Sequence, residues 1–276
     1  MVKQFKVGLV QFSPRMGLKE HNIEIMKKYI EKARLEDARL IIFPELSTSG
    51  YICRDTFYKL AEPLEGPSVR EIERSALENN VSVIFGMPRQ GAEEGVLHNS
   101  ALIVGPKGLL GFYDKIHLPT HTIFEEKRYF RPGYETRVID TEVGRIGLTI
   151  CYDLFFPEIT RLLVADGAQF IACISVSPDG RREYFETFTT ARAMENSVYL
   201  AYVNRVGIED GVQYWGGSRL MSPNGVRLTE LSYYDEKLIV GEVDYGDLPK
   251  IRAFLPTLRD LRPDLIKLLY DKAKGL

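Results

Sequence analysis

The chain has 276 residues, of which 45% are hydrophobic and 27% are charged, a balance typical of a globular protein with a sizeable core. Its formal net charge of −2 and its scattered basic residues give no reason to expect nucleic acid or an acidic membrane as a partner. The three cysteines, Cys53, Cys151 and Cys173, are widely spaced and form no C-x-x-C pair, which argues against a disulfide framework and a thiolate metal site.

No targeting or membrane-spanning segment is indicated. Residues 5–12 (FKVGLVQF) have the pattern of a short strand interrupted by lysine, not that of a signal peptide. The longest apolar runs fall far short of a membrane span. Cysteines without partners are typical of a reducing compartment. We therefore expect a soluble, cytoplasmic protein that binds neither nucleic acid nor membrane.

In the first half of the chain, strand and helix periodicities alternate. The expected elements are, in order, a strand at 5–12, a helix with apolar positions at Ile23, Met26, Ile30 and Ala33, a strand at 39–46, a helix, a strand at 81–86 and a hairpin at 101–115. Ser68 and Glu71 have the spacing of a capping box. We therefore expect the second helix to have Ser68 as its N-cap and to end near Asn79.

The second half repeats a similar order. It predicts a strand pair at 137–151, a helix at 157–166, a strand at 170–175, a helix at 183–196, a strand at 198–203 and a hairpin at 219–228. Turns at 105–108 and 222–225 occupy the same strand–turn–strand context, one in each half. We interpret this as internal pseudo-symmetry, two similar βα halves in one α/β domain spanning 1–276; a chance pair of turns is the alternative.

The C-terminal tail, residues 247–276, is interrupted by prolines and closes with an amphipathic helix. Such a segment does not extend a core sheet. We expect it to lie over the surface or to reach a partner subunit.

Three polar residues each follow an apolar strand: Glu45, Lys115 and Cys151. An α/β sheet gathers its active site at such strand ends. A cation lowers the pKa of a nearby thiol, a carboxylate accepts its proton, and the same cation stabilises the oxyanion formed when the thiolate attacks a carbonyl or nitrile carbon. Taken one at a time, the three have ordinary alternatives: a buried inert cysteine, a capping glutamate and a solvated lysine.

The stretches FPELSTSGY, YDKIHLP and TICYDLFFPEI, in this order and at these separations, resemble the carbon–nitrogen hydrolase (nitrilase) superfamily, in its amidase-like branch. The flanking stretches VGLVQFSPRMG, ARAMENSVYLAYVNRVG and LRDLRPDL extend the resemblance over nearly the whole chain. The resemblance implies a four-layer αββα sandwich. It also implies a thiol hydrolase without a cofactor that assembles as a homodimer or a multiple of it.

The resemblance also assigns roles to individual residues. Cys151 would be the nucleophile, Glu45 the general base and later acid, and Lys115 the oxyanion stabiliser. The backbone N–H of Tyr152 would be the second oxyanion donor. The implied reaction is attack by Cys151, loss of ammonia or an amine, a thioester acyl-enzyme, and hydrolysis by water that Glu45 activates.

A second glutamate follows the lysine motif in this family, upstream of a Pro-Gly pair. The best match in HTIFEEKRYFRPG is Glu126, with Glu125 one position off. Its role would be to orient Lys115 and the substrate amide or water. We place Tyr51 and Phe155 near the substrate as parts of the pocket wall.

Other site types find little support in the sequence. His117 and His121 have the spacing of a zinc-binding helix, but Pro119 between them disfavours a regular turn. No histidine lies in a signature of a cysteine-protease base. With no H-E-x-x-H motif and few other ligand candidates, we expect no metal. No glycine-rich nucleotide motif follows a strand, so we also expect no ATP, NAD or other cofactor.

Three functions remain as hypotheses. The first is hydrolysis of a small amide or N-carbamoyl compound; the second is a true nitrilase; the third is a binding protein that keeps the fold without catalysis. Nitrilases commonly have Trp-Glu after the nucleophile, whereas this chain has Tyr152 and Asp153, which favours the amide. Phe155 stands where some relatives carry an arginine for a substrate carboxylate, although Arg181 or Arg182 could replace it.

Overall fold

The computed structural model describes residues 3–275. The strands are β1 (Gln4–Gln11), β2 (Ala38–Ile42), β3 (Ser82–Gln90), β4 (Leu97–Gly105), β5 (Gly108–Asp114), β6 (Val138–Thr141), β7 (Gly144–Ile150), β8 (Phe170–Ser175), β9 (Tyr199–Asn204), β10 (Val206–Glu209), β11 (Val212–Trp215), β12 (Arg219–Met221), β13 (Arg227–Glu230) and β14 (Lys237–Asp244). The α-helices are α1 (Lys19–Leu35), α2 (Phe57–Leu60), α3 (Pro67–Asn79), α4 (Glu126–Tyr129), α5 (Pro157–Ala165), α6 (Arg182–Asn196), α7 (Leu248–Phe254) and α8 (Pro263–Ala273). Short 3₁₀ turns are η1 (Arg54–Thr56), η2 (Cys151–Phe155), η3 (Asp179–Arg181) and η4 (Tyr245–Asp247).

The strands of the first sheet send alternate side chains into two different cores. On β2, Leu40 and Ile42 pack in the core between the sheets, whereas Ile41 packs in the core beneath the helices. On β3, Ile84 and Val83 divide in the same way. This period of two follows from the pleat of a strand. Because both faces are covered, the central strands read in the sequence as unbroken apolar runs.

The two sheets have matching topologies. The first has the order β14-β1-β2-β3-β4-β5 and the second β13-β12-β9-β8-β7-β6. Each contains three neighbouring parallel strands, β1-β2-β3 in one and β7-β8-β9 in the other, followed by an antiparallel hairpin, β4-β5 or β12-β13. Each also has one further antiparallel edge strand, β14 or β6. The prediction of two similar βα halves is therefore confirmed.

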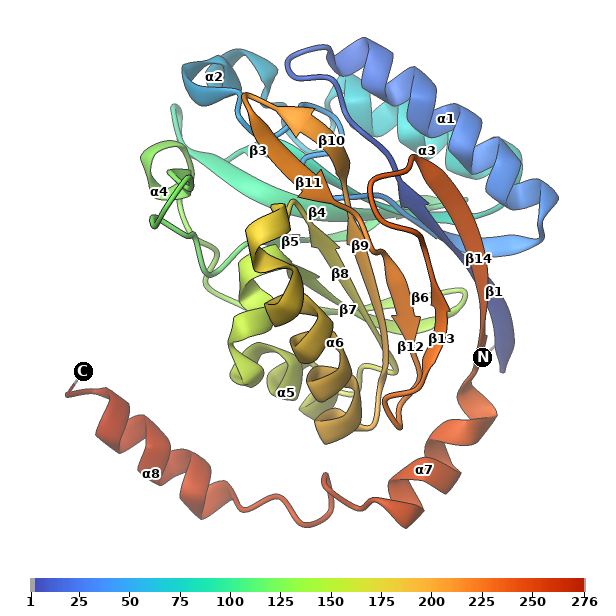
Figure 1. Ribbon diagram of the computed structural model, residues 1–276, viewed down its shortest axis with the longest axis vertical. Helices are drawn as coiled ribbons and strands as arrows, with labels where there is room; N and C mark the ends of the chain where they lie inside the picture. The colour runs from blue at the N-terminus through green and yellow to red at the C-terminus, as the bar shows by residue number, and fades with distance from the viewer. Residues whose placement is uncertain (1–2, 276) are drawn as a thin grey trace.

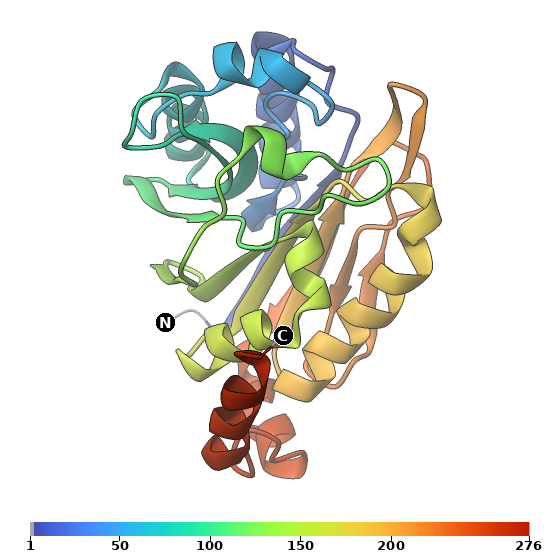
Figure 2. The ribbon, with the colours of Figure 1, turned by 90° about the vertical axis from the view of Figure 1, so that its left-hand side faces the viewer.

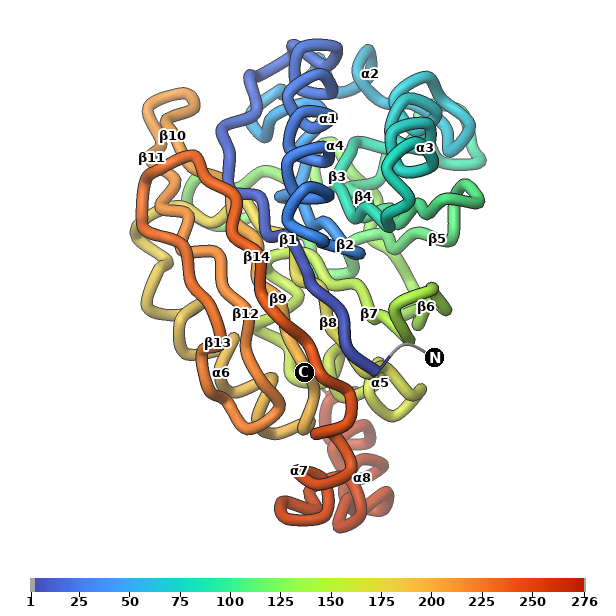
Figure 3. Tube along the Cα trace, turned by 90° about the vertical axis from the view of Figure 1, so that its right-hand side faces the viewer, coloured from blue at the N-terminus to red at the C-terminus, as the bar shows by residue number. Residues whose placement is uncertain are grey.

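The elements form four layers. Figure 1 shows α1 and α3 over the outer face of the first sheet and α5 and α6 over the outer face of the second, and the turned view in Figure 2 shows the same layers. Strand β14, from near the end of the chain, lies antiparallel beside β1 (Figure 3). The predicted four-layer αββα sandwich of the α/β class is confirmed. Among residues 3–275, no helix is both long enough and apolar enough to cross a membrane.

The capping box expected at the start of α3 is wrong. Gly66 is the N-cap and Pro67 the first helical residue, so Ser68 lies within the first turn. The N–H and the hydroxyl of Ser68 both donate to the carboxylate of Glu62, at 2.8 and 2.9 Å. Proline is well suited to the first helical position because it has no N–H to satisfy there. The Glu62 carboxylate, which lies before the helix, therefore accepts a backbone N–H of the first turn, the role that we had assigned to a Ser68 cap.

The tail leaves the layered body. Figure 1 shows α7 and α8 extending from the end of the sandwich, away from both sheets. Leu248, at the start of α7, is buried, but no residue of α8 is. The expected terminal helix is present as α8, and apolar side chains on it are exposed: Leu265, Ile266, Leu268, Leu269 and Tyr270.

Candidate active site

The three strand-end residues meet because their strands belong to facing sheets. Glu45 follows β2 and Lys115 follows β5 in the first sheet, and Cys151 follows β7 in the second. All three side chains are buried. A buried ammonium and a buried carboxylate are each costly to desolvate unless they are paired. Their placement therefore needs a compensating arrangement, which the contacts of Lys115 supply.

The Lys115 ammonium lies between two carboxylates. Its Nζ donates to Glu45 Oε1 at 2.8 Å and to Glu126 Oε1 at 2.7 Å. Burial disfavours the charged form of Lys115, but Glu126 and Glu45 outweigh burial and hold its pKa above the ordinary value. The lysine therefore stays charged. Because an ammonium has three N–H donors, one remains for a substrate atom.

Both oxygens of Glu45 are held by donors. Asn99 Nδ2 donates to Oε1 at 2.7 Å, beside Lys115, and the backbone N–H of Val176 donates to Oε2 at 2.8 Å. This fixes the carboxylate in one orientation between the sheets. We did not predict Asn99. The available signal was a polar run, His98-Asn99-Ser100, at the start of the otherwise apolar strand β4, where a buried amide must find a partner.

Cys151 sits at a sharp bend between strand and turn. Its φ is +48°, a left-handed conformation that costs a residue other than glycine about 1–3 kcal/mol. The buried carboxylate of Asp153 holds the bend: it accepts the N–H of Ile150 at 3.1 Å, the Tyr113 hydroxyl at 2.8 Å and the N–H of His117 at 2.9 Å. Asp153 thereby ties the cysteine turn to the segment that follows Lys115. It is a second residue whose contacts we did not predict.

Lys115 does not lower the pKa of Cys151 overall, as we expected it to. Burial and the neighbouring Glu45 carboxylate raise the pKa of Cys151 well above its usual range, although Lys115 lowers it. The thiol is therefore protonated in the free protein at neutral pH. A nucleophile in this state needs a base at the moment of attack.

The two candidates for the second glutamate lie in different surroundings. Glu126 is buried and bound to Lys115, whereas Glu125 is exposed. Burial raises the pKa of Glu126 to about 7, against the opposing effect of Lys115. The Tyr51 hydroxyl donates to Glu126 Oε1 at 2.7 Å. Within residues 3–275, Glu126 Oε2 is buried without a hydrogen-bond partner.

Aromatic rings gather beside the predicted nucleophile. The ring centroid of Tyr152 lies 5.1 Å from that of Phe155 and 5.3 Å from that of His121. Phe155 in turn packs against Tyr184, near the start of α6, with 5.8 Å between ring centroids. The structure thus places Tyr152 and Phe155 in one aromatic cluster beside Cys151. Tyr51 contacts the site through its hydroxyl.

Arg181 and Arg182, which we considered as substitutes for a cation at the position of Phe155, each stack on an aromatic ring. The Arg181 guanidinium lies 5.7 Å from the ring centroid of Tyr184, and that of Arg182 lies 5.1 Å from the ring of Tyr233. Both are half-buried.

A small hollow lies beside Glu126. It adjoins Glu126 and Tyr51, has a volume of about 40 Å³ and is bordered mainly by apolar side chains such as Ile52, Ile123 and Phe57. Polar groups at its mouth include Arg54, which pairs with Asp210. The hollow beside Glu126 is therefore small and largely apolar.

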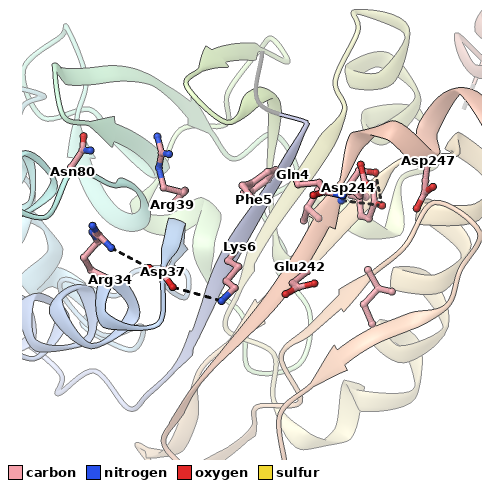
Figure 4. A pocket seen from close by; sticks show the side chains of 13 residues that line it. Gln4, Phe5, Lys6, Arg34, Asp37, Arg39, Asn80, Glu242, Asp244 and Asp247 are labelled. Atoms are coloured by element: carbon pink, nitrogen blue, oxygen red, sulfur yellow. Dashed lines mark hydrogen bonds and ion pairs between the residues drawn. The ribbon is translucent and has the colours of Figure 1, made fainter.

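A separate hollow of about 680 Å³ lies at the opposite ends of the strands (Figure 4). Its lining includes Gln4 of β1, Arg39 of β2 and Tyr199 of β9, all near the beginnings of parallel strands. Lys6 and Asp37 form a weak ion pair at its wall, at 3.9 Å. Ligands of α/β folds bind at the carboxyl ends of the strands, and this hollow contains none of the predicted site residues.

Comparisons with known proteins agree with the resemblance read from the motifs. The chain matches the family model described as carbon-nitrogen hydrolase over residues 6–253. A nitrilase from Pyrococcus abyssi is 34% identical over 245 residues, which cover 87% of this chain and 89% of the relative. The crystal structure of a carbon-nitrogen hydrolase from Helicobacter pylori G27 has a TM-score of 0.90 at 25% identity, covering 97% of this chain and 98% of that one.

A further solved structure is a Glu-to-Gln mutant of the amidase from Nesterenkonia sp. AN1. It shows covalent addition of the acetamide moiety of fluoroacetamide at the active-site cysteine. Its TM-score is 0.83 at 25% identity, covering 95% of each chain.

Proposed function

The chain belongs to the carbon–nitrogen hydrolase family, and on that premise we propose that it cleaves the non-peptide C–N bond of a small amide or N-carbamoyl compound through a thioester on Cys151. One observation carries the proposal: the Lys115 ammonium is held between Glu45 and Glu126, at the strand ends that also carry the cysteine. These groups together are a nucleophile, a base and an electrophile. A protein that kept the fold only for binding would gain nothing from such a buried, costly set.

In the acylation half of the reaction, Glu45 takes the proton of the Cys151 thiol while the sulfur attacks the carbonyl carbon. The free N–H of Lys115 and the backbone N–H of Tyr152 stabilise the oxyanion. Glu45 then donates the same proton to the substrate nitrogen. The C–N bond breaks, ammonia or an amine leaves, and the acyl group remains on sulfur as a thioester.

In the deacylation half, Glu45 takes a proton from water, and the resulting hydroxide attacks the thioester carbon. The C–S bond breaks, the acid leaves, and the proton on Glu45 returns to the sulfur. The high pKa of Cys151 supports this cycle because it favours a protonated thiol at rest, ready to be deprotonated only when substrate is present. The cysteine adduct of the Nesterenkonia amidase also supports a covalent intermediate here.

The free oxygen of Glu126 supports an amide over a nitrile. Glu126 Oε2 is buried without a partner among residues 3–275, and an ionised carboxylate oxygen is an acceptor. The NH₂ group of an amide can donate to it, whereas a nitrile has no N–H. The apolar position of Phe155 and the stacked Arg181 and Arg182 support a neutral or aliphatic acyl group. The runner-up is a nitrilase, as in the Pyrococcus relative.

A substrate panel tests the proposal. Small aliphatic amides, N-carbamoyl amines and the matching nitriles are incubated with the protein, and released ammonia and amine are quantified. We expect turnover of amides or carbamoyl compounds, with neutral acyl groups preferred to dicarboxylate monoamides. Turnover of nitriles alone would establish the runner-up. No turnover of any member would favour the non-catalytic hypothesis.

We also propose that residues 1–276 form one domain, that residues 247–276 are its tail, and that the tail joins subunits into a homodimer or a multiple of it. The support is the apolar face of α8, on which five large apolar side chains are 48–61% exposed: Leu265, Ile266, Leu268, Leu269 and Tyr270. A contiguous apolar surface of this kind marks an interaction site.

Deletion of residues 263–276 is expected to lower the mass measured by light scattering, because it removes the exposed apolar helix and no buried residue of α8. The matched control is Lys267→Ala, which alters the same helix without removing an apolar side chain. A full-length protein that is itself monomeric would contradict the proposal. So would a deletion variant that keeps the full oligomeric mass.

A further inference from the structure

A buried ion pair outside the reacting groups is formed by Arg205, between β9 and β10, and Glu209, the last residue of β10. Their side chains are 1% and 4% exposed, and Arg205 Nη1 donates to Glu209 Oε2. Such a pair is weak evidence of stabilisation, because desolvation offsets much of the attraction. Neither residue belongs to the motifs that identify the catalytic groups, so the contacts of the pair are informative.

The Glu209 carboxylate binds the backbone of the loop that follows Glu45. Its Oε1 accepts the N–H of Tyr51 at 2.8 Å and also the N–H of Ile52. The loop is built around this carboxylate. Gly50 has a φ of +80°, and a Cβ there would lie 2.8 Å from Met16 Cα and 3.1 Å from Glu209 Oε2.

Arg205 fixes Glu209 from the opposite side. Its guanidinium lies 4.6 Å from the ring centroid of Tyr214, and its Nη2 donates to Pro14 O at 3.4 Å. The arginine is thus held by an aromatic face and a backbone carbonyl. The orientation of the Glu209 carboxylate, and with it the position of Tyr51, is therefore set by a rigid surround.

Tyr51 links the anchored loop to the site. Its hydroxyl donates to Glu126 Oε1 at 2.7 Å, the same oxygen that accepts Lys115 Nζ. The backbone of Tyr51 is anchored by Glu209, and its side chain reaches Glu126. Displacement of the loop would move the hydroxyl away from Glu126. The carboxylate that orients Lys115 would then lose one of its two donors.

We propose that Glu209 is a positioning residue for Glu126, acting through the backbone and hydroxyl of Tyr51. This inference rests on the proposed function, because it assigns Glu209 to the reaction that Glu126 and Lys115 serve. Glu209 touches neither substrate nor reacting atoms. Its contribution is to hold Tyr51 so that Glu126 faces the ammonium and leaves its Oε2 open to the substrate.

A double-mutant cycle of Glu209→Gln and Tyr51→Phe tests the route. We expect Glu209→Gln to lower kcat/KM about 10-fold or more, as loss of a supporting hydrogen bond does elsewhere. In the Tyr51→Phe background, which already lacks the hydroxyl, the same change should lower kcat/KM less than about 2-fold, because coupled residues are not additive.

The pH profile supplies a second readout. An ionised Glu126 is needed to accept the substrate N–H, so kcat/KM falls as pH falls through the pKa of Glu126. Donation from Tyr51 lowers that pKa. Both single variants should therefore move the acid limb to higher pH, and the double variant should move it no further. A change that only weakens the fold would lower the amount of active protein without moving the limb.

Two further variants keep the test decisive. Glu209→Gln leaves the Arg205 charge buried without its partner, so Glu209→Asp, which keeps the charge and withdraws the carboxylate from the Tyr51 N–H, is measured alongside it. The matched control is Glu186→Gln. It removes a partner of another buried arginine, Arg219, at a site with no link to the Tyr51 loop. We expect this control to lower the unfolding midpoint and to leave kcat/KM and the acid limb unchanged.

Equal losses in kcat/KM for Glu209→Gln or Glu209→Asp in both backgrounds, with an unmoved acid limb, would overturn the positioning role while leaving the proposed function intact. A wild-type protein that turns over no member of the panel would overturn both. Non-additive losses together with the shifted limb support the role.

Discussion

We expect Cys151→Ala to lower kcat/KM for the best substrate of the panel by at least about 10,000-fold, because removal of the nucleophile of a coupled catalytic unit leaves only binding and oxyanion stabilisation. The fold should persist. Alanine can replace Cys151 after strand β7 because it is no larger. The Asp153 carboxylate that holds the turn bonds to Ile150, Tyr113 and His117, not to the thiol. Initial rates of ammonia release and an unfolding curve measure the two effects.

Cys53→Ser is the matched control for the loss of a thiol. Cys53 is also buried, and its Sγ donates to Ser49 O at 3.1 Å, a bond that the serine hydroxyl can replace. We expect this variant to keep activity within about 2-fold of wild type, as is usual away from a catalytic unit. Full activity in Cys151→Ala would refute the proposed mechanism outright, whatever the substrate.

The layers and the reacting groups were predictable because their signals are local. The runs that became β2 and β7 are apolar on both faces, the run that became β5 is largely apolar, and the residue that follows each run stands out against it. Each of Glu45, Lys115 and Cys151 could therefore be assigned to a strand end. The carboxyl ends of β2 and β5 lie at one edge of the first sheet, and the facing second sheet brings the end of β7 to the same place. Pseudo-symmetry was visible for the same reason, since turns such as 105–108 are short sequence features.

Residues that hold the catalytic groups were not predictable, because their partners are distant in the sequence. Asn99 bonds to Glu45 across 54 positions, and Glu209 bonds to Tyr51 across 158. No periodicity relates such positions, and a buried amide or carboxylate is recognisable only once its surroundings are known.

The prediction of element boundaries was wrong for a related reason. Ser68 and Glu71 have the local spacing of a capping box, but Pro67 starts the helix and Glu62 accepts the N–H of Ser68. Strands β10, β11 and β14 also went unpredicted. The first two flank an Asp210-Gly211 turn, a hairpin signal that the apolar pattern around it was too short to reinforce.

Glu45→Gln is expected to trap the acyl-enzyme. Glu45 serves as base for both the thiol and the water, but the two depend on it unequally, since a thiol loses its proton far more readily than water does. Deacylation should therefore slow more than acylation, and kcat should fall about 100- to 10,000-fold. Intact-mass spectrometry after incubation with the best amide should show an added acyl group, and peptide mapping should place it on Cys151.

The substitution also perturbs the hydrogen bonds of the site, which sets the necessary control. Asn99 and Lys115 donate to Oε1, and Val176 donates to Oε2, so either orientation of a glutamine places its NH₂ against a donor. We expect this conflict to lower the free energy of unfolding by about 1–3 kcal/mol, a loss that a stable domain survives.

The double variant Cys151→Ala with Glu45→Gln carries the same conflict without the thiol and should show no adduct. An adduct on Cys53 or Cys173 would contradict the assignment of Cys151 as the nucleophile, and unchanged turnover in Glu45→Gln would contradict the assignment of Glu45 as the base. An adduct confined to Cys151 would identify the acyl group by its mass. On the proposed placement of Phe155 beside the acyl group, the same spectrum reports which acyl groups this pocket admits.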